Sequence, residues 1–226
     1  MEHLRLFLAH VGKTGGTSLR HAAFAHFGKA RCVTLYPMGR TGNVGGAAEL
    51  FEAERERAGR TAAAAAVLDL LTRSGAAYFS THYLDLFGDR LPPEKTVAFV
   101  RDPVDRTISQ YNFWRQRGRD VGAFEDFVAR DDLRDVQTRM LARIDLDAIA
   151  VVGVTDRHGE AVTLINRRLG LALQPKRSNR TGWRPWRISR SRLSPALIRR
   201  IEENNPRDMA LYARARARFD RDLAAP

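Results

Sequence analysis

The chain is organised around one stretch near its N-terminus, His10-Val11-Gly12-Lys13-Thr14-Gly15-Gly16-Thr17-Ser18-Leu19. An apolar run over residues 4–9 precedes it and predicts a buried strand, and residues 20–27 after it predict a helix. A strand, a glycine-bearing turn and a helix together form a cradle for an anion. In such a cradle the N–H groups of the turn and of the helix N-terminus point at one spot, and the helix dipole adds positive potential.

The side chains of this stretch suit an anionic ligand. The pair Gly15-Gly16 allows the backbone to curl and to approach a ligand closely. Lys13 supplies a mobile positive charge, and hydroxyl donors come from Thr14, Thr17 and Ser18. We therefore expect the loop to hold a phosphate, although an ordinary strand-to-helix turn is the simpler alternative.

The stretch does not meet the pattern of a Walker A loop. That pattern requires a glycine five residues before the Gly-Lys-[Ser/Thr] group, and the position in question is Phe7, inside the predicted strand. The glycine pair here follows the lysine instead. A nucleoside triphosphate is therefore a weaker expectation than a phosphate in general.

Composition indicates one globular α/β domain over residues 1–226. Of these residues 44% are hydrophobic and 28% are charged, as in soluble globular proteins. The apolar runs are much shorter than a membrane span and no basic leader opens the chain, so we expect a cytoplasmic protein with no integral membrane segment. Cys32 stands alone, which excludes an internal disulfide and a zinc site built from several cysteines.

The net charge of +12 is concentrated late in the chain. Residues 161–201 contain eleven basic residues and no Asp or Glu. A block of one sign attracts anionic partners, although a solvated face would have the same composition. Lysine is scarce, with 4 residues against 34 arginines, so the lysine at position 13 hints at a site that needs a compact ammonium.

The remaining segments alternate between predicted strands and helices. Strands are expected at 76–80, 96–100 and 148–154, and helices at 47–73 (with a break near Gly59), 103–117, 124–129, 132–143, 158–169, 195–204 and 206–223. This alternation predicts a mostly parallel central sheet with helices on both faces. Ligands of such sheets bind at the carboxyl ends of the strands, where the first loop, His82 and Arg101 all fall.

A second informative stretch is Val100-Arg101-Asp102-Pro103-Val104-Asp105-Arg106-Thr107-Ile108-Ser109-Gln110-Tyr111. Arg101 ends a strand, and Ser109 lies two turns into the helix that follows. The two side chains can converge on one phosphate, the guanidinium by a bidentate contact and the hydroxyl by a hydrogen bond. The alternative is that Arg101 pairs with Asp102 or Asp105 and that Ser109 is exposed.

Together the two stretches resemble those of the PAPS-dependent sulfotransferases, in particular the carbohydrate and heparan sulfate 2-O-sulfotransferase-like family. The first motif of that family, His-x-Pro-Lys-Thr-Gly-Gly-Thr-Ser, is matched by residues 10–18 with Gly12 in place of Pro. The second, Arg-Asp-Pro-x-x-Arg-x-x-Ser-x-Tyr, is matched by residues 101–111. Weaker similarities at Thr81-His82, 136–139 and 152–157 extend the resemblance over most of the chain. It implies a P-loop-like three-layer α/β sandwich.

The resemblance also implies the chemistry. The donor would be PAPS, the product PAP, and the acceptor a hydroxyl group. The 5′-phosphosulfate would lie on the first loop, at Lys13, Thr14, Gly15, Gly16, Thr17 and Ser18, and the 3′-phosphate would lie on Arg101 and Ser109. Lys13 would neutralise the oxygen of the leaving group, and His82, at the family position of the base, would accept the proton of the hydroxyl. No metal is implied.

The late basic segment fits the same scheme. In the family a late loop covers the nucleotide, and Arg177 and Arg180 are the candidates here for contacts with the 3′-phosphate. The domain would then consist of a PAPS-binding core, 1–170, followed by the basic loop and the closing helices, 171–226. The surplus of arginine favours an acidic acceptor such as an anionic carbohydrate. Two other functions stay open: a P-loop nucleotide kinase, and a basic module that binds nucleic acid.

Overall fold

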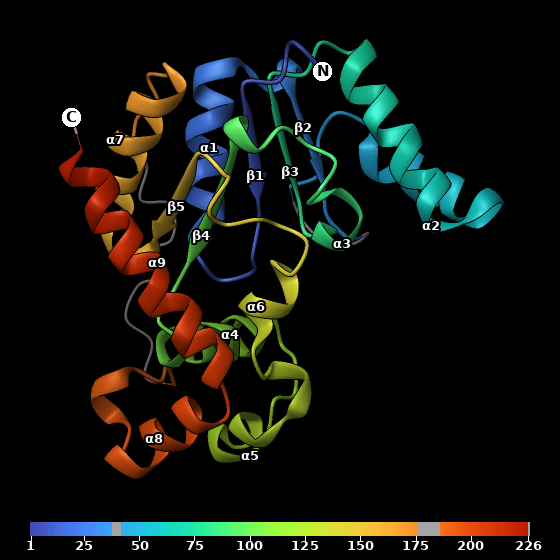
Figure 1. The fold of residues 1–226 in the computed structure, drawn as a ribbon. Coiled ribbons are helices and arrows are strands. Elements are labelled where there is room, and N and C mark those ends of the chain that lie inside the picture. The colour runs from blue at the N-terminus through green and yellow to red at the C-terminus, as the bar shows by residue number, and fades with distance from the viewer. Residues whose placement is uncertain (38–41, 176–185, 226) are drawn as a thin grey trace.

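The computed structural model describes residues 1–37, 42–175 and 186–225. Its centre is a sheet of five parallel strands in the order β2-β3-β1-β4-β5 (Figure 1). All residues of the five strands are buried, which fits the short apolar runs of the sequence and a sheet covered on both faces. The strands are β1 (Leu6–Ala9), β2 (Cys32–Leu35), β3 (Tyr78–Thr81), β4 (Thr96–Val100) and β5 (Val151–Val154).

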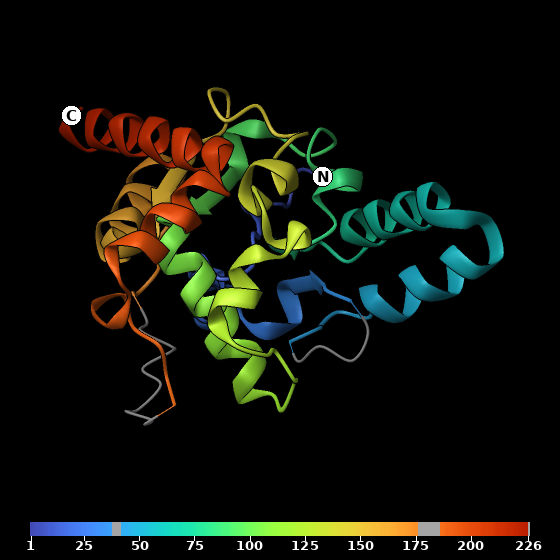
Figure 2. The same ribbon diagram turned by 90° about the horizontal axis from the view of Figure 1, so that it is seen from below.

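Helices flank this sheet, so the predicted α/β architecture with a parallel central sheet is confirmed. α1 packs against β2 and β3 on one face, and α9 crosses β5 on the other (Figures 1 and 2). The helices are α1 (Gly16–Phe27), α2 (Ala47–Arg73), α3 (Leu84–Phe87), α4 (Pro103–Gln116), α5 (Phe124–Ala129), α6 (Val136–Met140), α7 (His158–Leu169), α8 (Pro195–Glu203) and α9 (Pro206–Ala224).

The elements with strong local signals lie where the sequence predicts them. β4 has the predicted bounds, and α4 begins at Pro103 behind Asp102, whose side chain accepts a hydrogen bond from the N–H of Asp105. α7 ends at Gly170 in the left-handed conformation. α2 is kinked at Gly59, so that its two segments diverge at the β2 side of the molecule (Figure 2).

Other elements differ from the prediction. β2 was not expected, because Thr34 interrupts its apolar run and no strong pattern marks it in the sequence. The helix expected over 132–143 is a 3₁₀ turn, Asp131–Leu133, followed by the short α6. Asp135 separates the two because it adopts a φ of 47°, which no continuous α-helix allows.

Beyond the carboxyl ends of the strands lie α4, α5, α6 and α8, at the bottom of Figure 1. A second apolar cluster, separate from the core around the sheet, joins α4, α5 and α8. It includes Val104, Phe127 and Ile201, which are almost completely buried. This cluster fixes α4 in front of the sheet edge at which ligands of such folds bind.

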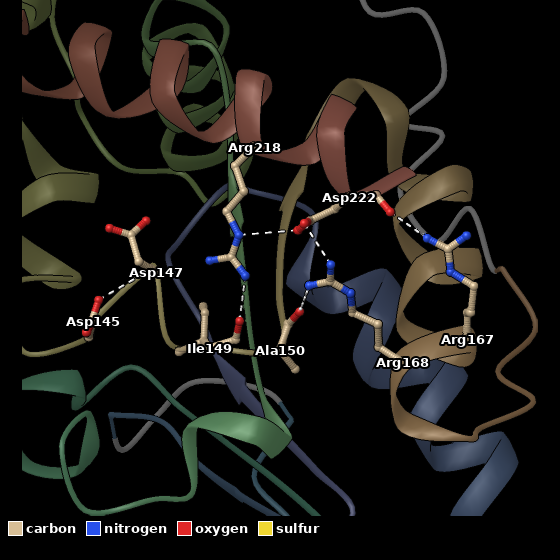
Figure 3. Close-up of polar contacts among 8 residues, drawn as sticks. All are labelled: Asp145, Asp147, Ile149, Ala150, Arg167, Arg168, Arg218 and Asp222. Carbon is tan, nitrogen blue, oxygen red and sulfur yellow. Dashed lines mark hydrogen bonds and ion pairs between the residues drawn. The ribbon is translucent and has the colours of Figure 1, made fainter. Parts of the chain in front are cut away.

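At the opposite end of the sheet, arginines hold α9 and α7 to the start of β5 (Figure 3). Arg218 donates to the carbonyl of Ile149 at 2.6 Å and pairs with Asp222 at 3.2 Å. Arg168 donates to the carbonyl of Ala150 at 2.7 Å and pairs with the same Asp222 at 2.7 Å. We call this set of five groups, the two guanidinium groups, the Asp222 carboxylate and the two carbonyls, the amino-end clamp. No helix in the part of the chain that the structure describes is long and apolar enough to cross a bilayer.

Candidate donor and catalytic site

One side chain follows each strand directly, and the strand order sets these five residues in a row along the carboxyl edge of the sheet. Two of them are predicted site residues: Arg101 as a phosphate ligand and His82 as the base. In spatial order the row is Tyr36, His82, His10, Arg101 and Thr155. The strand order therefore brings together residues that are far apart in the sequence.

The first loop has the backbone of an anion cradle. Lys13 and Gly15 both adopt positive φ values, 73° and 88°, and Gly15 caps α1 without any side-chain hydrogen bond to the helix N-terminus. The N-terminal donors of α1 are therefore not occupied by a capping side chain. Gly16 cannot be larger, since a Cβ there would lie 2.3 Å from the ring of His10. The side chain of Thr14 is turned back, and its hydroxyl donates to the carbonyl of Val11 at 2.9 Å.

The ammonium of Lys13 lies over the face of an aromatic ring on α4. Its Nζ is 3.9 Å from the ring centroid of Phe113, within the range of a cation–π interaction. Burial, together with the positive charges of Arg101, Arg117, Arg106 and Arg187, lowers the pKa of Lys13 to about 8. An anion bound here would reverse that effect, because it stabilises the protonated ammonium.

Arg101 joins the two sequence motifs. Its Nη1 donates to the carbonyl of Lys13 at 3.3 Å, so the guanidinium lies against the first loop, residues 10–18, which we call the anion loop. Arg101 forms no ion pair with Asp102 or Asp105, which was the alternative. Asp102 instead pairs with Arg190 at 2.8 Å. Burial lowers the pKa of Arg101, while carboxylates at longer range, Asp105 first, oppose the shift.

The backbone of Arg101 is held by Gln137 of α6. The Gln137 side chain accepts from the N–H of Arg101 at 2.8 Å and donates to its carbonyl at 2.9 Å. Asp208 of α9 in turn accepts the N–H groups of Gln137 and Thr138. The segment at 136–139, a supporting similarity in the sequence, thus fixes the end of β4.

Arg106 is a member of the site that sequence reasoning did not single out. It is only 2% exposed, and it forms no ion pair within 4 Å among the residues that the structure describes. Its pKa is lowered to about 10, mainly by burial and also by the charges of Arg139 and Arg101, while the Asp208 carboxylate opposes the shift. Arg106 could have been predicted from its place in the Arg-Asp-Pro-x-x-Arg motif.

His82 is oriented by the backbone of the first loop. The carbonyl of His10 lies 2.6 Å from Nδ1 of His82, so this nitrogen carries the proton and donates it. In the neutral ring the lone pair is therefore on Nε2, as a general base requires. His82 also lines a hollow of about 220 Å³, whose other walls are Leu84, Asp85, Val136, Arg139 and Met140.

A buried polar network lies behind His82. The Tyr36 hydroxyl is 3.0 Å from Nδ1 of His10 and 2.8 Å from the hydroxyl of Ser80. The ring centroid of His10 lies 4.5 Å from that of His82, and the same ring leaves no room for a Cβ at Gly16. His10 thus contacts both Gly16 of the first loop and His82, and its ring is itself hydrogen-bonded to Tyr36.

Thr155 and His158 complete the loop's surroundings. The Thr155 hydroxyl lies 2.9 Å from the carbonyl oxygens of both Thr14 and Val100, and its single hydrogen serves one of them at a time. A Cβ on Gly15 would lie 3.2 Å from the ring of His158. Burial lowers the pKa of His158. The contact of His158 with the loop could not be predicted from sequence spacing.

The other predicted site residues have different outcomes. Ser109 is half-buried on α4, two turns from Arg101, and no short contact joins the two side chains. Arg177 and Arg180 lie outside the residues that the structure describes. Within the described ranges, no group of three or more His, Cys, Asp or Glu side chains is placed to hold a metal ion.

Comparison with known proteins identifies no family for this chain. No protein-family model matches it, and no curated protein matches it at a significant level.

Proposed function

We propose that the protein is a PAPS-dependent sulfotransferase. It transfers a sulfuryl group from PAPS to an acceptor hydroxyl, on a carbohydrate or glycoconjugate, and releases PAP. One observation carries the proposal: the hydrogen bond from Arg101 to the Lys13 carbonyl, 3.3 Å long, joins the two motifs that resemble the family's phosphate-binding stretches. A linear triphosphate would need only the first of these motifs, whereas a nucleotide with anionic groups at its 3′ and 5′ positions uses both.

The chemistry of the residues fits such a ligand. Lys13, Arg101 and Arg106 are positively charged, largely buried and without a carboxylate within 4 Å in the described parts of the chain. Buried cations are stabilised when an anion pairs with them, so this set of charges favours an anionic ligand. The first loop adds backbone donors at the N-terminus of α1.

In the proposed reaction the acceptor oxygen forms a bond to sulfur while the bond between sulfur and the 5′-phosphate oxygen breaks. The hydroxyl proton passes to Nε2 of His82, the nitrogen opposite the one that donates to the His10 carbonyl. PAP leaves with the electron pair of the broken bond, and Lys13 neutralises the charge that develops there. The enzyme contributes positioning and charge stabilisation, and no step requires a metal.

The hollow beside His82 is the proposed place of the acceptor. Leu84, Val136 and Met140 give it an apolar side, and Arg139 gives it a positive charge. An anionic carbohydrate remains the proposed acceptor class, because a sugar ring has an apolar face and Arg139 could pair with an acidic substituent.

The direct test is the transfer of labelled sulfate from PAPS to a panel of glycans, glycolipids and small alcohols. Label in at least one acceptor, dependent on Lys13, is the expected result. Retention on immobilised PAP, compared with ATP and with DNA at moderate salt, separates the sulfotransferase from a nucleotide kinase and from a nucleic-acid-binding module. Preferential retention on ATP or on DNA would refute the proposal.

The role of His82 can be tested separately. His82→Ala is expected to retain PAP binding and to lose activity by about 10²–10⁴-fold, the usual contribution of a general base. His26→Ala is the matched control, since His26 lies exposed on α1. Full activity of His82→Ala would exclude His82 as the base.

A further inference from the structure

A short extended segment from the C-terminal part of the chain lies along α4, and a buried amide holds it there. Asn112 donates from Nδ2 to the carbonyl of Ile188 at 2.8 Å and accepts from its N–H at 3.0 Å. Asn112 is only 5% exposed. Both backbone groups of one residue are therefore bound by one side chain, in the manner of a strand pair.

Contacts on both sides of Ile188 continue this attachment. Arg115 donates to the carbonyl of Trp186 at 3.3 Å, and its guanidinium lies 5.6 Å from the ring centroid of Trp186. Arg190 pairs with Asp102 at 2.8 Å. The segment 186–190 is thus attached to α4 at its two ends and at its middle.

The attachment bears on the donor site because α4 also carries residues of that site. Phe113, the residue after Asn112, lies under the ammonium of Lys13, and Ser109 lies one turn earlier. Arg187, the residue before Ile188, is near enough to Lys13 for its charge to lower the Lys13 pKa. The segment therefore brings a cation from the acid-free block of the sequence toward the anion loop.

We propose that Asn112 is a positioning residue of the donor site, which holds residues 186–190 against α4 so that Arg187 contributes to the binding of the donor's anionic groups. The assignment rests on the proposed function for the identity of the ligand. A purely structural tie is the competing explanation, and it predicts that loss of Asn112 changes stability without changing the electrostatics around Lys13.

The first experiment needs no ligand. The chain has four lysines, so ¹³C-dimethylation followed by NMR titration gives a resolvable signal for Lys13. Arg187→Gln is expected to raise the pKa of Lys13, because it removes a like charge, and Arg101→Gln is expected to raise it more. Asn112→Ala should raise it as Arg187→Gln does, and Arg199→Gln, at an exposed position of α8, should leave it unchanged.

The second experiment measures PAP affinity by calorimetry. Arg187→Gln is expected to weaken PAP binding about tenfold, the effect of one charge-assisted hydrogen bond. If Asn112 acts through Arg187, the double variant Asn112→Ala/Arg187→Gln loses no more PAP affinity than the single variant with the larger loss. Independent effects would instead give the sum of the two losses.

The outcomes separate the two proposals. If Asn112→Ala is folded and leaves the Lys13 pKa unchanged, or if the Arg187→Gln variant binds PAP like the wild type, the positioning role is wrong. If Asn112→Ala does not fold, the Arg187→Gln titration and affinity decide the matter alone. Failure of the wild type to bind PAP refutes the proposed function instead, while the pKa titration still tests the placement of Arg187.

Discussion

The two ends of the sheet use arginine in opposite ways. At the amino end, Arg218 and Arg168 share Asp222 and bind the carbonyls of the two residues before β5 (Figure 3). At the carboxyl end, Arg101 is half-buried and Arg106 is buried, and neither has a carboxylate within 4 Å among the described residues. The paired cations of the clamp hold helices in place, whereas the unpaired cations of the carboxyl end lower one another's pKa.

This difference indicates that the partners of an arginine, rather than the composition of the chain, separate the arginines that hold helices in place from those proposed to bind a ligand. In a chain with 34 arginines, a basic segment alone says little. Burying a cation without a counter-charge is unfavourable, so a fold that keeps several such cations together needs a reason. A ligand that supplies the missing negative charge is the reason proposed here.

The largest expected effect comes from Lys13. Lys13→Met should lower sulfate transfer by about 10²–10³-fold, the loss typical of one group that stabilises transition-state charge. It should not lower stability, because it removes a buried charge that lies among other cations. Activity assays with thermal denaturation of the same sample check both parts. A variant that keeps its activity would contradict the role of Lys13.

Arg101 should matter for binding more than for folding. Arg101→Gln is expected to weaken PAP binding about tenfold to a hundredfold, the range for a hydrogen bond to a charged group. Its control is Arg168→Gln, the same substitution at the amino end, which should leave PAP affinity unchanged. Calorimetric titration of both variants measures the contrast, and equal losses of affinity would remove it.

The clamp should show the converse behaviour. The side chains of Arg218 and Asp222 are 12% and 16% exposed, and Arg218→Met leaves the Asp222 carboxylate with one partner fewer. We expect a loss of about 1–3 kcal/mol, which corresponds to a melting temperature lower by about 2–12 °C for a domain of this size. PAP affinity should stay as it is. Unchanged melting with reduced PAP affinity would mean that the two ends are assigned the wrong way round.

The smallest expected effect is the uptake of a fraction of a proton by Lys13 when PAP binds. The pKa of Lys13 is about 8 without ligand, against an ordinary value of 10.5, and a bound anion raises it. PAP binding above pH 8 should therefore take up a fraction of a proton, which calorimetry in buffers of different ionisation enthalpy detects. By the same linkage the Lys13 contribution to stability rises with pH between about 8 and 10.5, since the unfolded chain binds more protons there. The variant Lys13→Met should lose the uptake; an uptake that persists would come from another group.

Much of the fold could be predicted from local signals. β4 and α4 follow from the run Thr-Val-Ala-Phe-Val, the cap Asp102 and the first-turn Pro103. β2 could not be predicted, since Thr34 interrupts its apolar run and its place in the sheet comes from its pairing with β3.

The site divides in a similar way. The anion loop and Arg101 have sequence motifs, so they could be named in advance. Phe113, Arg106 and His158 reach the same site only because α4 and the start of α7 pack against the loop, which depends on the strand order. The partner of Asp102 is likewise not its neighbour in sequence but Arg190, 88 residues away.

The measurement that bears most directly on the central claim is a calorimetric comparison of PAP with ATP, the latter with magnesium. A site with separate cradles for a 3′-phosphate and a 5′-phosphate should bind PAP in a 1:1 complex and at least about tenfold more tightly than ATP, the worth of one additional charge-assisted contact. Binding of ATP as tight as that of PAP, or tighter, would contradict the account.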